Sequence, residues 1–357
     1  MKRILFLITF ALLLPMFSLS VSADEVGGGY VNEFFEALPD GIKEKIGGEE
    51  NILNSVGIEA LLGEIISQIS GQGSQISAFF ACLTAIFILS AASSFSHSAT
   101  GDMASRVINI VGAVLIYGRI SALFTSVSQS IEEICTFFAS LIPITSAVSA
   151  MSGASLTANT QASGMYLILT LFSGGGGRLL SLLSAFSLAL ALSGSLGGET
   201  ATRILRGFKS LFGWTVGILT ALISGVIALQ TVISSASDSA VLRTARYMTT
   251  SLVPVVGSTV SSALSTLSGG LSYARSVIGG GAIGAILLLA LSPLVMLLLY
   301  RLALSLCLSL SEMLGVQSGT FSSFRFSLDA ITSLYALMSI SFILQLILFI
   351  KVGSLLV

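Results

Sequence analysis

Apolar stretches of about 20 residues recur along this chain, and about 20 is the number that an α-helix needs to cross a membrane. They lie at 76–95, 107–127, 178–196, 211–233, 277–300 and 331–350. Only 9% of the residues are charged and 54% are hydrophobic, whereas soluble domains carry about 25% charged residues. Lipid must therefore be the solvent for most of the chain. The pattern predicts an all-α, polytopic integral membrane helix bundle.

Other apolar segments leave the number of crossings open, at about 6–8 spans. Residues 134–151 contain Pro143 and are compatible with a re-entrant hairpin. The segment 164–172 is short, and the run Gly174–Gly177 that follows it favours a helix break or close packing. Residues 302–314 carry Glu312 inside an otherwise apolar run, so that segment either crosses or lies at the surface.

The amino-terminal 75 residues differ from the rest. Lys2 and Arg3 precede an apolar run and a small-x-small site ending at Ala23, which predicts a secretory signal over 1–23; an uncleaved anchor is the alternative. Residues 24–75 hold ten acidic and two basic side chains and predict a small helical segment outside the cytoplasm. Its first helix should show one apolar stripe, formed by Tyr30, Phe34, Phe35 and Leu38. The multi-spanning domain is expected over 76–357.

Basic residues set the expected orientation, because cytoplasmic loops are enriched in lysine and arginine. The region before Trp214 carries basic residues and fits the cytoplasmic face: Arg203, Arg206 and Lys209. Arg301 also fits that face if 302–314 crosses. The region 234–276 departs from the rule. The order of the spans places it outside the cytoplasm, and yet it is basic.

Catalytic and cofactor motifs find no support in the sequence. His97 is the only histidine, so a nucleophile has one possible histidine base. No GKS or GKT follows the glycine run, which argues against a phosphate loop. The three cysteines are far apart and form no CxxC pair. We expect no enzyme activity, no cofactor, no metal site and, without a clustered basic face, no nucleic-acid binding.

Two charges fall inside apolar runs and are the candidate intramembrane charges, Arg119 and Glu312. An unpaired charge at bilayer depth costs at least about 2.5 kcal/mol. The two residues are therefore predicted to form a structural ion pair or to line a conduit, unless the span boundaries lie elsewhere and neither charge is at bilayer depth. Small-xxx-small pairs such as Gly213 and Gly217 predict close helix packing within the chain or in a homo-oligomer.

Several short motifs in the last third of the chain resemble one family. They are Ser251-Leu252-Val253-Pro254-Val255-Val256-Gly257-Ser258-Thr259-Val260, Ser292-Pro293-Leu294, Tyr300-Arg301-Leu302-Ala303 and Leu328-Asp329-Ala330-Ile331. Together with the glycine-broken span at 277–291, they resemble stage III sporulation protein AE. The motif residues are Pro254, Gly257, Pro293, Arg301 and Asp329. The family pattern implies lysine where this chain has Arg301, and the positive charge is kept.

The resemblance implies a role in endospore-forming bacteria. Members are expected in the mother-cell membrane around the forespore, as permease-like core subunits of a trans-envelope channel or secretion complex. Their implied partners are other membrane proteins of the sporulation operon, a cytoplasmic ATPase and a forespore-side channel protein. A stand-alone secondary transporter and a membrane scaffold without a conduit remain the alternatives. Matching halves within the sequence would favour a transporter, and the sequence shows no convincing pair of them.

Overall fold

A computed structural model of the chain describes residues 34, 36–39, 63, 66–67, 70–94, 99–151, 155–195, 207–208, 210–233, 257–313 and 319–354. The regular structure in these ranges is entirely helical, which confirms the all-α prediction for the described chain. The main helices are α6 (Gly73–Ser94), α7 (Ala99–Met151), α8 (Ser155–Ser195), α10 (Gly257–Met313) and α11 (Gly319–Ser354). A further helix, Ser210–Ile233, is called the outer helix below.

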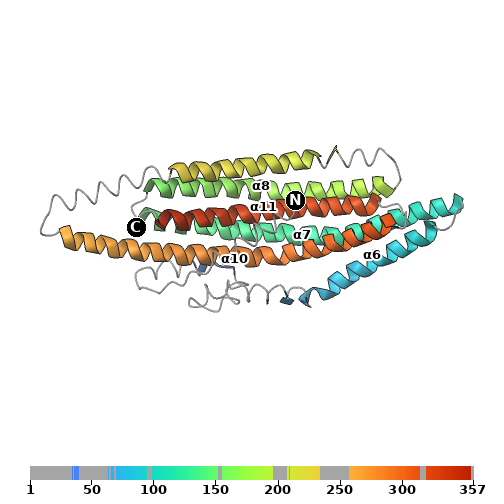
Figure 1. The fold of residues 1–357 in the computed structure, drawn as a ribbon, viewed down its shortest axis with the longest axis horizontal. Coiled ribbons are helices and arrows are strands. Elements are labelled where there is room, and N and C mark those ends of the chain that lie inside the picture. The colour runs from blue at the N-terminus through green and yellow to red at the C-terminus, as the bar shows by residue number, and fades with distance from the viewer. Residues whose placement is uncertain are drawn as a thin grey trace.

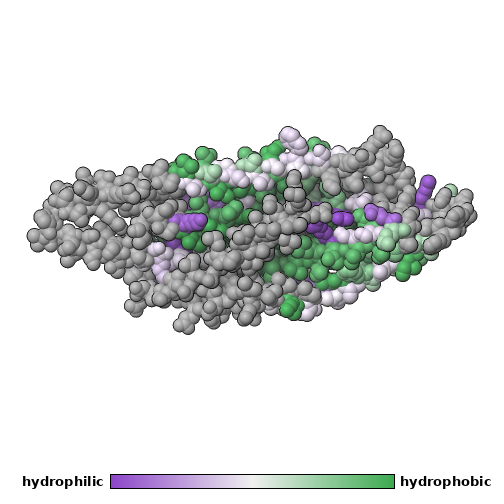
Figure 2. All heavy atoms as spheres, in the orientation of Figure 1, coloured by the Kyte–Doolittle hydropathy of each residue, from purple (hydrophilic) through white to green (hydrophobic). Residues whose placement is uncertain are grey.

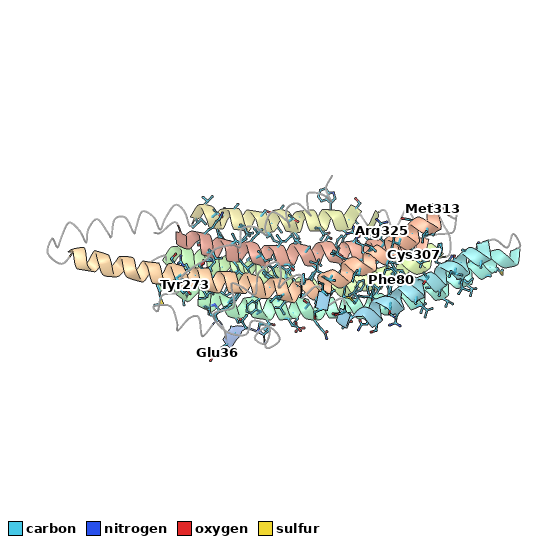
Figure 3. The ribbon with its side chains drawn as sticks, turned by 60° about the horizontal axis from the view of Figure 1, so that its bottom comes forward. Glu36, Phe80, Tyr273, Cys307, Met313 and Arg325 are labelled. Atoms are coloured by element: carbon cyan, nitrogen blue, oxygen red, sulfur yellow. The ribbon has the colours of Figure 1, made fainter. Side chains whose placement is uncertain are left out.

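The helices form an elongated bundle in which α11 lies inside, against α7, α8 and α10 (Figure 1). Side-chain contacts fix their directions. Ser130 of α7 meets Tyr335 of α11, and Phe138 meets Phe342 further along, so α7 and α11 are parallel. Helix α10 runs the opposite way, and its end at Met313 lies near Arg325 of α11 while Tyr273 lies toward the other end (Figure 3).

The described chain contains five helices that are long and apolar enough to cross a membrane. This finding supports a membrane protein, while a total of about 6–8 spans stays a prediction. At 1.5 Å per residue, the 53 residues of α7 and the 57 of α10 extend about 80 and 85 Å. A bilayer's hydrocarbon core is only about 30 Å thick. Neither helix can therefore lie in lipid over its whole length as one straight crossing.

Three expectations about breaks in the chain are wrong. Residues 134–151 form no re-entrant hairpin, because α7 continues through Pro143 to Met151. The run Gly174–Gly177 does not interrupt α8. The helix that begins the predicted span 277–300 does not end at Arg301, since α10 is continuous from Gly257 to Met313 and includes most of 302–314. Proline and glycine are tolerated in such helices because neighbouring helices, serine or threonine side chains and small local adjustments satisfy the backbone groups that they leave unpaired.

The outer helix is the least covered element of the bundle. Only 11% of its apolar window is buried, against 56% for α11. Its large side chains are correspondingly exposed, with Leu211 at 69% and Trp214 at 73%. Figure 1 shows this helix (yellow) along the side of α8, and Figure 2 shows exposed apolar atoms in green along the described face. Such a surface suits hydrocarbon as its solvent.

The amino-terminal segment is described at few positions. Phe34 and Leu38, two members of the predicted apolar stripe, are buried in the same hydrophobic core as the bundle. Glu36 between them is exposed (Figure 3). The predicted signal over 1–23 lies outside the described residues, as does the region 234–256.

Close helix contacts at glycine give a first prediction. A methyl group at Gly279 would overlap the side chain of Ile350 on α11, whereas one at Gly217 of the outer helix would meet nothing within 4 Å. Gly279→Ala should lower the apparent Tm of the detergent-solubilised protein, because overpacking costs about 1–3 kcal/mol. Gly217→Ala should leave it unchanged or raise it, because alanine favours a helix by about 1 kcal/mol over glycine. Equal melting of the two variants would contradict this packing.

Candidate functional site

Polar side chains from four helices meet inside one end of the bundle. We call Ser149 of α7, Gln161 of α8, Gln230 of the outer helix and Gln345 of α11 the glutamine cluster. Gln345 is fully buried, and the other two glutamines are at most 5% exposed. Gln230 is the polar position at which the exposed outer helix reaches the interior, and its neighbours Leu229 and Thr231 face outward.

Hydrogen bonds link members of the cluster on all four helices. Gln230 Nε2 donates to the Thr160 carbonyl of α8 at 3.1 Å, and Gln345 Nε2 donates to Gln230 Oε1 at 2.9 Å. Ser149 Oγ donates to Gln161 Oε1 at 3.4 Å. The amide of Gln230 occupies the space that a side chain at residue 164 would need, so Gly164 is what allows this approach.

A second polar contact lies at the centre of the bundle. Ser130 Oγ and Tyr335 Oη are 2.7 Å apart, and Ser130 Oγ also donates to the Leu289 carbonyl of α10 at 3.2 Å. One hydroxyl therefore ties α7, α10 and α11 together. A buried polar group costs free energy unless it is hydrogen-bonded, so this arrangement fixes how the three helices align.

An ion pair joins α10 to α11. Arg301 Nε lies 2.5 Å from Asp329 Oδ1, and each side chain is 30% exposed. Both residues belong to the motifs that carried the family resemblance. Their pairing gives those motifs a physical role, because it neutralises two charges at the boundary between two long apolar helices.

The predicted pairing of Arg119 with Glu312 is wrong, because the structure forms no ion pair between these two described residues. Both side chains are exposed. Arg119 acts electrostatically on Tyr300 of α10, whereas Glu312 lies some three turns further along that helix, about 18 Å away at 1.5 Å per residue. The two charges therefore sit at different depths, which the sequence does not reveal.

The other predicted residues are placed as follows. Pro254 lies outside the described residues, and Gly257 is the first residue of α10. Pro293 is buried inside that helix. Arg275, from the region 234–276 that was predicted to lie outside the cytoplasm, is 2% exposed within α10, with its guanidinium 5.8 Å from the ring centre of Phe349.

The described residues contain no group of three or more metal-ligating side chains. His97 lies outside them, and the absence of enzyme activity stays a prediction. The glutamine cluster was not predicted from the sequence. Its signal was present as Gln230 and Gln345 inside the apolar runs at 211–233 and 331–350, but an amide carries no charge, so a search for intramembrane charges passes over it.

The ion pair supports a prediction with an internal control. Asp329→Asn should lower the apparent Tm, because it leaves the Arg301 charge without its partner. Losing one partner of a fully buried pair costs about 3–5 kcal/mol, and the 30% exposure of both side chains should reduce that loss.

Changing both Arg301 and Asp329 to leucine should restore much of the apparent Tm, because no lone charge remains. Arg325→Leu on α11 should have little effect, since Arg325 has no ion-pair partner in the described chain. Loss of stability in the double variant equal to that in the single one would refute a stabilising role for the pair.

The glutamine cluster supports a further prediction about stability. Gln230→Leu removes the acceptor of Gln345 and the donor to the Thr160 carbonyl, and each stranded buried group costs about 1–3 kcal/mol. The variant should melt earlier and expose the outer helix to proteolysis. Thr231→Val is the matched control, because Thr231 bonds only within its own helix, to the Ile227 carbonyl. Wild-type stability in Gln230→Leu would show that the outer helix is held by other contacts.

Comparison with known proteins adds to this geometry. The family model described as stage III sporulation protein AE matches residues 38–354. Stage III sporulation protein AE of Bacillus subtilis (strain 168) is 20% identical over 300 residues, which cover 80% of this chain and 74% of the relative. No solved structure matches the chain. The resemblance inferred from the motifs is thereby confirmed: the chain belongs to the stage III sporulation protein AE family, which implies a role in sporulation.

Proposed function

We propose that this protein is a permease-like core membrane subunit of a trans-envelope channel or secretion complex between mother cell and forespore, required for endospore development. It resides in the mother-cell membrane surrounding the forespore, with its amino-terminal segment outside the cytoplasm. Other membrane proteins of the sporulation operon assemble with it, a cytoplasmic ATPase supplies the energy, and a forespore-side protein completes the channel.

The observation that carries this proposal is the polar interior of an otherwise apolar bundle. The glutamine cluster and the Ser130–Tyr335 contact place hydrogen-bonding groups inward from α7, α8, α11 and the outer helix. In hydrocarbon, helices associate readily through small apolar residues alone. Polar residues that face the bundle interior are typical of membrane proteins that move substrates or ions.

The test combines a deletion with isolation of the complex. In an endospore former that carries this gene, deletion should block forespore maturation after engulfment and abolish heat-resistant spores. A tagged copy isolated from sporulating cells should bring down the operon's membrane proteins and the ATPase, as measured by mass spectrometry. An unrelated tagged multi-pass protein serves as the control.

Each alternative predicts a different result. A stand-alone transporter would be isolated without these partners, and normal spore counts in the deletion strain would remove the sporulation role of this chain. A scaffold would assemble and support sporulation even when Gln230 and Gln345 are both leucine. The channel proposal expects such cells to retain the complex and yet to make fewer spores.

A further inference from the structure

The hydrogen-bond direction within the glutamine cluster is fixed by the backbone. The Thr160 carbonyl can only accept, so the amide nitrogen of Gln230 must face it, as the 3.1 Å contact shows. Gln230 Oε1 then faces Gln345 and can only accept, so Gln345 must present its nitrogen, at 2.9 Å. The free end of Gln345 is therefore its oxygen. Turning over either amide, or both, would break at least one of these two hydrogen bonds.

Two polar atoms at this place have no protein partner in the described chain. They are Gln345 Oε1, an acceptor, and Gln161 Nε2, a donor whose own oxygen is occupied by Ser149. Both belong to side chains at least 95% buried. Leaving either atom without a hydrogen bond costs about 1–3 kcal/mol, and in native proteins such atoms are normally satisfied by protein or by bound water.

These two atoms are complementary and are placed in one connected group. Gln161 follows Thr160, whose carbonyl accepts from Gln230, and Gln230 accepts from Gln345. The group also lies close to an end of the bundle. Ser149 is two residues from the end of α7 at Met151, and Met151 is 51% exposed.

We propose that the glutamine cluster is an interior binding site for water, in which one molecule donates to Gln345 Oε1 and accepts from Gln161 Nε2. Both atoms belong to neutral amides, so the site suits a small neutral molecule that donates and accepts at once. Buried waters typically make about three hydrogen bonds to otherwise unsatisfied groups. The bound water joins α8 to α11 and continues the chain of bonds that holds the outer helix.

A buried methionine provides a local reporter for this water. Met165 is fully buried and lies one turn from Gln161 on the same face of α8, where Thr145 Oγ1 contacts its sulfur at 3.5 Å. X-ray radiolysis converts a bound water into a hydroxyl radical, which adds to the sulfur of a neighbouring methionine, and dissolved oxygen then removes the second electron to give the sulfoxide. Met338 of α11, 1% exposed, lies two helical turns from Gln345 and is the reference for a buried methionine farther from the bound water.

The experiment irradiates the purified full chain in lipid nanodiscs and measures oxidation at each methionine by mass spectrometry. Met165 should oxidise several-fold faster than Met338, although both are buried. Replacing Gln161 and Gln345 together by leucine removes both ends of the site and should reduce Met165 oxidation to the level of Met338. Gln129→Leu, an exposed glutamine of α7, is the matched control and should change neither rate.

Equal oxidation of Met165 and Met338 in the wild-type protein would overturn the proposal, and this comparison needs no variant to fold. Fast oxidation of Met165 that persists in a double variant eluting as the wild type does would also overturn it, because the water would then reach Met165 by another route. The measurement uses the isolated chain, so its outcome is independent of the partners and of the sporulation role proposed above.

Discussion

Hydrocarbon offers no hydrogen-bond donor or acceptor, and the rest of this structure depends on that property. Every backbone amide within the membrane must be bonded inside its own helix, which explains why α7 and α8 continue through Pro143 and through four successive glycines. The same rule applies to side chains. Polar groups inside the bundle find partners across helices, and these partners decide which helices lie together.

The length of the helices adds a second constraint. An 80 Å helix exceeds the hydrocarbon thickness more than twofold. Glu132 and Glu133, both exposed, lie near the middle of α7, and Arg301 lies between two apolar parts of α10. Helix ends therefore do not mark the bilayer boundary in this protein. Charges within the helices, more than loops, divide each long element into its apolar parts.

The polar contacts also differ in what they connect. Ser130 and the Arg301–Asp329 pair join the inner helices α7, α10 and α11. Gln230 instead holds a helix that is otherwise largely exposed. The outer helix thus depends on few inward contacts, among them Ile223 and the ring of Phe212 against Phe326. A change in the cluster would act first on this helix and leave the inner ones in place.

The sequence alone was enough to show that lipid surrounds most of the chain, that the fold is helical, and which family the chain belongs to. Hydropathy and charge density are local properties, and short motifs around Pro254, Pro293 and Asp329 carry the family pattern. Only the tertiary structure decided which polar groups meet. Gln230 and Gln345 are 115 residues apart, and Arg119 and Glu312 prove to lie at different depths. Such pairings depend on helix direction, register and the face turned inward, and in a uniformly apolar sequence these are set by packing between helices.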